Sequence, residues 1–313
     1  MRVIALEEHF TSPFLPVHGA GRRPDIAAKL ADLGEGRLSG MDAAGIDVQV
    51  LSPSSPGTHL QSPADAVATA RDANDLLAEA VAAHPDRFAG FALLPMPAPE
   101  AAAAELERCV STLGFKGTMI HGHVNGRFLD DLAFSPVLAC AEALGVPVYL
   151  HPTPPTRAVF DAYFSGLPGR TGEALAGAAW GWHAETGLHA LRLVLGGCFD
   201  RFPRLAVVIG HMGENLPFSL ARADSVLSPA ATHLKGRVAD YFHEHFYVTT
   251  SAYFTLPPFQ CALAVLGIDR LLFSVDYPFS DNDEARRFLD TVPLSPADLE
   301  KLAHGNAERL LGL

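Results

Sequence analysis

The sequence predicts an α/β fold, a (β/α)8 TIM barrel formed by one domain that spans residues 1–313. Three observations favour this fold. Short apolar runs alternate with amphipathic helical stretches along the whole chain, the alternation repeats about eight times, and 313 residues is a common length for a single barrel. A doubly wound open sheet has the same alternation and is the alternative topology.

Eight apolar segments have the length and composition of buried parallel strands. They are 2–6, 47–52, 88–95, 115–120, 146–150, 206–210, 246–250 and 271–275. Between the strands, apolar residues recur at helical spacing, as at Val67, Ala70, Leu77 and Val81. Helices are predicted at 63–83, 98–108, 134–144, 174–196, 213–227 and 283–290. The Pro- and Gly-rich stretch 152–172 is the longest candidate loop, and it follows a strand end, where barrel enzymes keep their active-site loops.

Composition and charge exclude several classes of protein. Apolar residues make up 49% of the chain and charged residues 19%, which is typical of a packed globular domain. The net charge of -12 disfavours a nucleic-acid partner and favours a small-molecule substrate. The first ten residues do not resemble a secretory signal, and no apolar run is long enough to cross a membrane, so we expect a cytoplasmic protein. The cysteines are too widely spaced for a disulfide framework or a zinc knuckle: Cys109, Cys140, Cys198 and Cys261.

Polar side chains follow the predicted strands at the end where a barrel carries its active site. Glu7 and His9 follow the first strand, and alternation along that strand places them on the same side, with Glu8 facing away. His151 follows the fifth strand and Asp276 the eighth. Two imidazoles and two carboxylates that converge on one mouth suit zinc, manganese or iron better than calcium or magnesium.

Each of these four residues also has an ordinary interpretation. A single histidine is more often a surface or core residue than a metal ligand, and two spaced polar residues near an N-terminus are common. Asp276 precedes Tyr-Pro and can simply begin a turn. Their joint placement at strand ends favours the metal-site interpretation over the separate ones.

His211 follows the sixth strand and directly precedes a predicted helix. Glu214 comes one turn later on the same face, so it can orient the imidazole or raise its basicity, as for an acid-base histidine. The alternative is a helix start where Glu214 only favours the dipole. Arg222 on the same helix can bind a carboxylate with its planar fork, although most helical arginines are merely solvated.

Other polar residues are weaker candidates. His121 and His123 resemble a ligand pair, but we expect loop histidines there. His243 and His245 are expected on the approach to a strand, and Lys116 is expected to be structural rather than a carbamylated metal bridge. The sequence contains no G-x-S-x-G elbow, no P-loop and no G-x-G-x-x-G, so it does not support a serine hydrolase or a nucleotide-binding protein.

Five segments, taken together, resemble a known group of enzymes. They are ALEEHF at the start, HPTPP at 151–155, the stretch 185–218, LLFSVDYPF at 271–279 and HGNAERLLGL at the end. In this order they resemble the metal-dependent decarboxylase branch of the amidohydrolase superfamily, which includes γ-resorcylate, 2,3-dihydroxybenzoate, 5-carboxyvanillate and aminocarboxymuconate-semialdehyde decarboxylases. The resemblance covers essentially the whole chain.

The resemblance implies a role for each matching residue. It makes Glu7, His9, His151 and Asp276 the ligands of one divalent ion, zinc or manganese, with His211, Glu214 and Asp276 catalytic and Arg222, Asn125 and Phe279 at the substrate. The E-x-H start favours the benzoate-type decarboxylases over the muconate-type branch. The segment TSPFLPVHGAGRRPD at 11–25 does not reproduce the pocket aromatics of the resorcylate enzymes, which leaves the substrate open. Because relatives of this type form dimers and tetramers, the resemblance also implies a homodimer or homotetramer.

The implied reaction is the reversible, non-oxidative decarboxylation of a 2-hydroxybenzoate. The substrate would bind the ion through its carboxylate and ortho hydroxyl, and Asp276 would deliver the proton to the ring carbon. The alternative is a hydrolase of a lactone, ester or amide that uses a metal-activated water, because that reaction needs the same ligands. A metal-binding barrel without catalysis is disfavoured, since it leaves the His211–Glu214 pair without a purpose.

Overall fold

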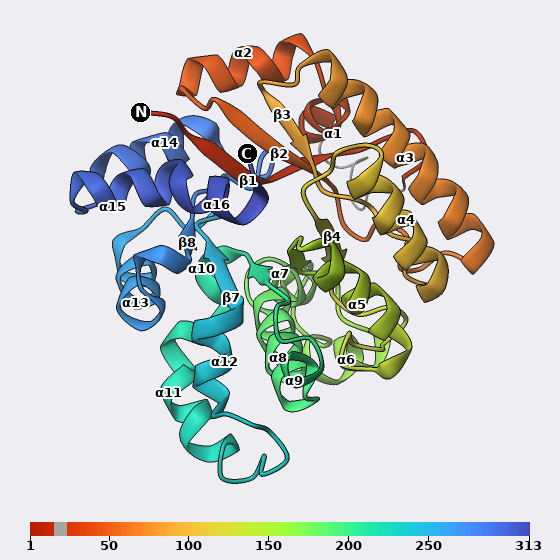
Figure 1. The fold of residues 1–313 in the computed structure, drawn as a ribbon, viewed down its shortest axis with the longest axis vertical. Coiled ribbons are helices and arrows are strands. Elements are labelled where there is room, and N and C mark those ends of the chain that lie inside the picture. Colours follow the sequence, from red (N-terminus) through yellow and green to blue (C-terminus); the bar gives the residue numbers. More distant parts are fainter. Residues whose placement is uncertain (16–23) are drawn as a thin grey trace.

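The computed structural model describes residues 1–15 and 24–313, and within them the chain forms a barrel of parallel strands (Figure 1). The strands are β1 (Ile4–Phe10), β2 (Val48–Pro53), β3 (Phe88–Gly90), β4 (Thr118–His121), β5 (Val148–His151), β6 (Val207–Ile209), β7 (Phe246–Thr249) and β8 (Leu271–Leu272). Each overlaps one of the eight strands predicted from the sequence. The part of the segment 11–25 at residues 16–23 lies outside the described residues.

The strands close into a ring in sequence order. β1 pairs with β2 and β2 with β3, and a second run of pairs joins β4 through β8. Two isolated parallel bridges link the runs, Ala92 to Thr118 and Glu8 to Tyr277, and the His9 amide donates to the Tyr277 carbonyl over 2.6 Å. Every pair is parallel, so the (β/α)8 barrel is confirmed and the doubly wound sheet is wrong.

Helices surround the strands, with α11 and α12 reaching away from the barrel (Figure 1). In the described residues they are α1 (Pro24–Ala31), α2 (Glu35–Ala44), α3 (Pro63–Ala83), α4 (Pro99–Ser111), α5 (Ser135–Leu144), α6 (Arg157–Tyr163), α7 (Thr171–Ala176), α8 (Gly181–Leu195), α9 (Cys198–Arg201), α10 (His211–Glu214), α11 (Leu216–Leu227), α12 (Val238–His245), α13 (Leu256–Leu266), α14 (Asn282–Thr291), α15 (Pro296–Glu300) and α16 (Asn306–Leu311). None of these helices is long and apolar enough to cross a membrane.

Helix ends agree best with the sequence where a cap fixes them. α3 has the predicted bounds, because Ser62 accepts a hydrogen bond from the Asp65 amide and Pro63 occupies the first turn. α14 starts one residue before its prediction, where the Asp281 carboxylate accepts from two amides of the first turn. Both caps are local sequence signals, so the sequence alone locates these ends well.

Two predicted segments are wrong in detail. The predicted helix 174–196 is split, with α7 ending at Ala176 and α8 starting at Gly181, because the chain doubles back so tightly that a Cβ on Gly181 would lie 2.4 Å from the Ala176 carbonyl oxygen. The predicted loop 152–172 contains α6 and the start of α7. Both segments contribute to the lining of one pocket, through Pro154 and Ala178.

Strand β1 carries a bulge that positions the site. Ile4 and Leu6 belong to the apolar cluster inside the barrel, so strict alternation would point Glu8 inward as well. The pairing of β1 with β2 shifts by one residue between Ala5 and Glu8, and above this point Glu7 and His9 face inward instead. The bulge therefore lets one strand supply both the apolar floor and two polar groups of the mouth.

Candidate metal centre

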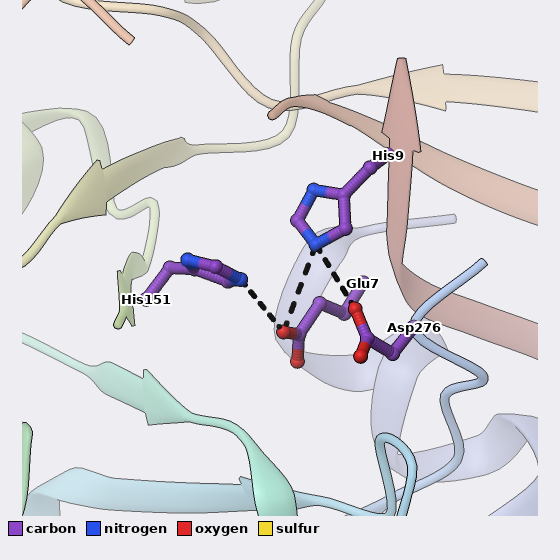
Figure 2. Close-up of side chains that lie close together, drawn as sticks. All are labelled: Glu7, His9, His151 and Asp276. Atoms are coloured by element: carbon purple, nitrogen blue, oxygen red, sulfur yellow. Dashed lines mark ion pairs between the residues drawn. The ribbon is translucent and has the colours of Figure 1, made fainter. Parts of the chain in front are cut away.

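Four side chains from three strand ends meet at the mouth of the barrel (Figure 2). The four residues are Glu7, His9, His151 and Asp276. Glu7 Oε1 lies 3.2 Å from His151 Nε2 and 3.8 Å from His9 Nε2, and His9 Nε2 lies 3.2 Å from Asp276 Oδ1. All four residues are buried, and their potential ligand atoms lie within 4.8 Å of one another, close enough for a single ion.

Neighbouring groups aim the ligand atoms at a common point. His151 Nδ1 donates to the Pro152 carbonyl oxygen over 2.7 Å, which fixes the ring and leaves Nε2 directed at Glu7. One oxygen of Glu7, Oε2, accepts short hydrogen bonds from Tyr149 and Ser251. The other carboxylate oxygen of Glu7 is thereby held toward the centre of the group.

Two buried atoms at this centre are unsatisfied. Among the described residues, Glu7 Oε1 and His9 Nε2 have no hydrogen-bond partner although both are shielded from water. Unpaired buried polar atoms are costly, and here both belong to groups that bind transition metals. The residues therefore fit a divalent ion such as zinc or manganese, which satisfies these atoms when it is bound.

Without an ion, the carboxylates at this centre favour a proton on His9. Burial alone lowers the pKa of His9, but the nearby carboxylates of Asp276 and Glu7 raise it to about 9. Burial alone raises the pKa of Glu7, but His211 and the neighbouring imidazoles lower it well below its usual range. The site thus concentrates negative charge that either protons or a metal ion neutralise.

Metal affinity is expected to fall as the pH decreases below about 9. Below its pKa of about 9, His9 carries a proton that must leave before Nε2 can bind the ion. The loss is expected to approach tenfold, about 1.4 kcal/mol, per pH unit. Calorimetric titration of Mn²⁺ into metal-free protein, in buffers of different ionisation enthalpy, measures the affinity and the protons released. An affinity that stays constant between about pH 6 and pH 8 would contradict this coupling.

Glu8 holds the loop that carries Asp276. Its carboxylate points away from the centre and accepts hydrogen bonds from the backbone amides of Val275 at 2.9 Å and Tyr277 at 3.3 Å. These amides flank Asp276, whose φ of 73° is a left-handed conformation that is unfavourable for a residue with a side chain. Glu8 thus stabilises a backbone conformation that the position of the Asp276 carboxylate requires.

Replacing Glu8 by glutamine is expected to destabilise the protein by about 1–3 kcal/mol, because one buried acceptor oxygen becomes a donor facing backbone amides. Metal affinity should fall as well, since the Asp276 loop loses its anchor. Urea unfolding of metal-free protein and Mn²⁺ titration measure the two effects. The matched control is Glu79→Gln, which removes an exposed carboxylate from α3. Equal stability of the two variants would show that Glu8 does not anchor this loop.

A second buried cluster lies beside the first. His211 Nδ1 is 2.8 Å from Glu214 Oε1, and His183 Nδ1 from α8 is 2.6 Å from Glu214 Oε2. His211 precedes the regular helix as predicted, but Glu214 is not on it: left-handed φ values run from His211 to Asn215, and the regular helix α11 starts only at Leu216. This tight loop turns the two side chains toward each other, and His211 Nε2 comes to 3.8 Å from Asp276 Oδ2.

An apolar pocket opens onto both clusters. Its volume is about 170 Å³, and its lining residues are Ser55, His151, Pro154, Ala178, Trp182, His211, Asp276 and Phe279. The Phe279 ring lies edge-on to His9, with 5.6 Å between ring centroids. The pocket is smaller than the 300–1,000 Å³ typical of drug-sized ligands, so it suits a single-ring molecule with one polar edge.

Comparison with known proteins connects this geometry to a family. The family model described as amidohydrolase matches residues 9–313. The chain belongs to the amidohydrolase family. Among curated relatives of this amidohydrolase, a gamma-resorcylate decarboxylase of Polaromonas sp. (strain JS666) is 40% identical over 99% of this chain and 98% of its own length. The decarboxylase orsB of Emericella nidulans is 38% identical over 99% and 96%.

Solved structures agree with these relatives. A dihydroxybenzoic acid decarboxylase from Polaromonas sp. JS666, with bound manganese and the inhibitor 2-nitroresorcinol, matches with a TM-score of 0.93 and 38% identity over 100% of this chain and 97% of its own. The 5-carboxyvanillate decarboxylase LigW from Sphingomonas paucimobilis matches with a TM-score of 0.92 and 34% identity over 100% and 99%. The resemblance inferred from sequence motifs is confirmed.

Two predicted substrate residues of this amidohydrolase lie away from the pocket. Arg222 is exposed on α11, and Asn125 is exposed in a turn with a φ of 50° that lines a separate hollow. Neither residue belongs to the described lining of the pocket, whereas Phe279 does. A substrate contact from Arg222 or Asn125 therefore stays a prediction.

Among the weaker candidates, one histidine is placed differently from expectation. His121 is not a loop residue: it ends β4, is fully buried and packs its ring 5.1 Å from the His151 ring. His243 and His245 lie at the end of α12, which runs directly into β7, in agreement with their expected place on the approach to a strand. Lys116 donates to the Gly312 carbonyl over 3.1 Å, in agreement with a structural lysine.

Proposed function

We propose that this amidohydrolase catalyses the metal-dependent, non-oxidative decarboxylation of a small hydroxylated aromatic carboxylic acid of the 2-hydroxybenzoate type. The observation that carries the proposal is the buried group of two carboxylates and two imidazoles at one edge of an apolar, single-ring pocket. Relatives that are about 40% identical over almost the whole chain are decarboxylases of such acids.

Removal of CO₂ from an aromatic ring requires a proton on the carbon that carries the carboxylate, because a bare aryl anion is too high in energy. A divalent ion bound by Glu7, His9, His151 and Asp276 supplies Lewis-acid stabilisation of negative charge on oxygen. The protein itself must orient the ring and deliver the proton.

Asp276 is proposed as the proton donor. It lines the pocket, and its carboxylate lies between His9 and His211, at 3.2 Å and 3.8 Å from their Nε2 atoms. His211 is proposed to hold the phenolic edge of the substrate. The Nδ1–H group of His211 donates a hydrogen bond to Glu214. Trp182 and Phe279 provide the apolar surfaces that hold a flat ring over the polar edge. Such fixed positioning itself lowers the barrier.

A panel of substrates tests the proposal against hydrolysis. Protein loaded with Mn²⁺ is incubated with several 2-hydroxybenzoates and with aryl lactones, and CO₂ release and ring opening are measured. Release of CO₂ from the benzoates alone is expected, together with carboxylation of the matching phenol at high bicarbonate. Hydrolysis of the lactones without CO₂ release would assign the chain to the alternative, a hydrolase that uses a metal-activated water.

We also propose a cytoplasmic, single-domain homodimer or homotetramer that works with manganese or zinc. Manganese is supported by its presence in two related solved structures. Assembly is supported by an exposed stripe on α11, where Phe218, Arg222 and Val226 follow one another at four-residue spacing and Phe218 is 90% exposed. Metal analysis of protein purified without chelators and light scattering in solution test these two points.

A further inference from the structure

His183 is buried behind the pair His211 and Glu214, and no sequence motif predicts a role for it. It lies in the first turn of α8, and its Nε2 is 2.9 Å from the Ala178 carbonyl oxygen. Its Nδ1 is 2.6 Å from Glu214 Oε2, while the other oxygen of Glu214 is 2.8 Å from His211 Nδ1. One carboxylate thus joins two imidazoles, and one of them reaches the pocket.

The hydrogen-bond partners fix where protons must lie. A carbonyl oxygen can only accept, so the Nε2 of His183 donates to Ala178. The contact between Nδ1 of His183 and Glu214 then needs one more proton, on either the imidazole or the carboxyl group. The pKa of Glu214 lies below its usual value, so its carboxyl group is ionised and both oxygens accept, Oε2 from His183 and Oε1 from His211.

The three side chains also form a group that could hold a metal ion. The distances favour hydrogen bonds over coordination. Two ligands of one tetrahedral zinc ion, each about 2.0 Å from the metal, lie about 3.3 Å apart. The two nitrogen–oxygen contacts of Glu214 are 2.6 Å and 2.8 Å.

We propose that His183 is a positioning residue for the reaction: it holds Glu214 so that His211 keeps its proton on Nδ1 and directs Nε2 at the substrate. This inference rests on the proposed function. His183 does not line the pocket, so it acts through Glu214 and His211. Its bond to Ala178, which lines the pocket beside Trp182, ties the pocket wall to the same network.

Removal of the His183 contact should change how activity depends on pH. The groups that face the Glu214 carboxylate are His211, His183 and the phenol of Tyr253. Burial raises the pKa of Glu214, but His211 and the hydrogen bond from His183 lower it below its usual value. Without His183 the pKa of Glu214 rises, so the carboxylate becomes protonated at a higher pH. The acidic limb of the kcat profile then moves to higher pH.

Two substitutions separate the two nitrogen atoms of His183. The amide nitrogen of asparagine is as many bonds from Cα as Nδ1, so His183→Asn keeps a donor toward Glu214. The amide nitrogen of glutamine corresponds to Nε2, so His183→Gln keeps the bond to Ala178 and loses the bond to Glu214. His189→Gln is the matched control, because His189 is buried on the same helix and its Nε2 accepts from the Leu129 amide without touching Glu214.

We expect His183→Gln to lower kcat about tenfold or more. Its KM should stay within about twofold, and its acidic limb should move to higher pH. His183→Asn is expected to recover most of the activity, and His189→Gln to resemble the wild type. Unchanged kcat and pH profile in His183→Gln, or equal impairment of the asparagine and glutamine variants, would overturn the positioning role. The positioning role would also be overturned if the wild type bound a second zinc ion per chain and both His183 variants lost it.

Nitrogen-15 NMR of the histidine rings tests the same inference without a substrate. In Zn²⁺-loaded protein the His211 ring is expected to carry a proton on Nδ1 in the wild type and in His183→Asn, and to lose this preference in His183→Gln. A His211 ring protonated only on Nε2 in the wild type would overturn the proposal. This wild-type result decides the question even if the His183→Gln variant does not fold. Because this measurement needs no turnover, it separates a failure of the positioning role from a failure of the proposed reaction.

Discussion

Replacing Asp276 by asparagine is expected to lower kcat for decarboxylation by about a thousandfold, within the range for loss of a general acid. Asparagine has almost the same shape and keeps an oxygen that can bind the ion, but its amide cannot deliver a proton to the ring carbon. Of the two carboxylates among the four metal-site residues, only Asp276 lines the pocket. Glu7 is completely buried beneath the pocket. The loss should therefore appear mainly in kcat, with a smaller change in KM.

Metal content separates this chemical effect from the loss of a ligand. Asp276→Asn should still bind a divalent ion, more weakly than the wild type, so its kcat is measured at saturating Mn²⁺. The control is Asp283→Asn, because Asp283 is an exposed carboxylate in the first turn of α14, close in sequence but outside the group. A saturated Asp276→Asn enzyme that decarboxylates at the wild-type rate would refute proton delivery by this residue.

Local signals explain which parts of the fold were predictable. The eight strands follow from apolar runs of the right length, and the bounds of α3 follow from Ser62 and Pro63. The split between α7 and α8 was not predictable, because the close approach of Gly181 to Ala176 depends on how the chain folds back over the barrel mouth. The same holds for the bulge in β1, which depends on the register with β2.

The site shows the same division between local and tertiary signals. Glu7, His9, His151 and Asp276 follow the ends of the strands predicted from the sequence, so their convergence could be predicted once a barrel was assumed. The groups that hold them could not. Tyr149 on β5 and Ser251 just after β7 both contact Glu7, and His183 reaches Glu214 across 31 positions of sequence. Sequence motifs identify residues that lie near each other along the chain. The contacts that support the metal ligands form only when strands and helices from distant parts of the chain pack together.

Metal removal is expected to abolish turnover and to lower the melting temperature. At a free metal concentration 1,000 times the Kd, binding stabilises the folded state by about 4 kcal/mol. For a chain of this size that corresponds to a loss of roughly 8 °C on chelation, by extrapolation from somewhat smaller domains. The physical cause is that two buried atoms, Glu7 Oε1 and His9 Nε2, have no hydrogen-bond partner in the described part of the chain. A bound ion supplies the missing interaction.

Variants show whether the stabilisation arises at this centre. In His9→Ala the chelator should change the melting temperature little, because the ion is already bound weakly, whereas His243→Ala, which removes an exposed histidine from α12, should respond like the wild type. Addition of Mn²⁺ to chelated wild type should restore both melting temperature and CO₂ release. A wild-type melting temperature unaffected by chelation, with turnover retained, would mean that protons on His9 and its neighbours satisfy the buried carboxylates and that the chemistry runs without an ion.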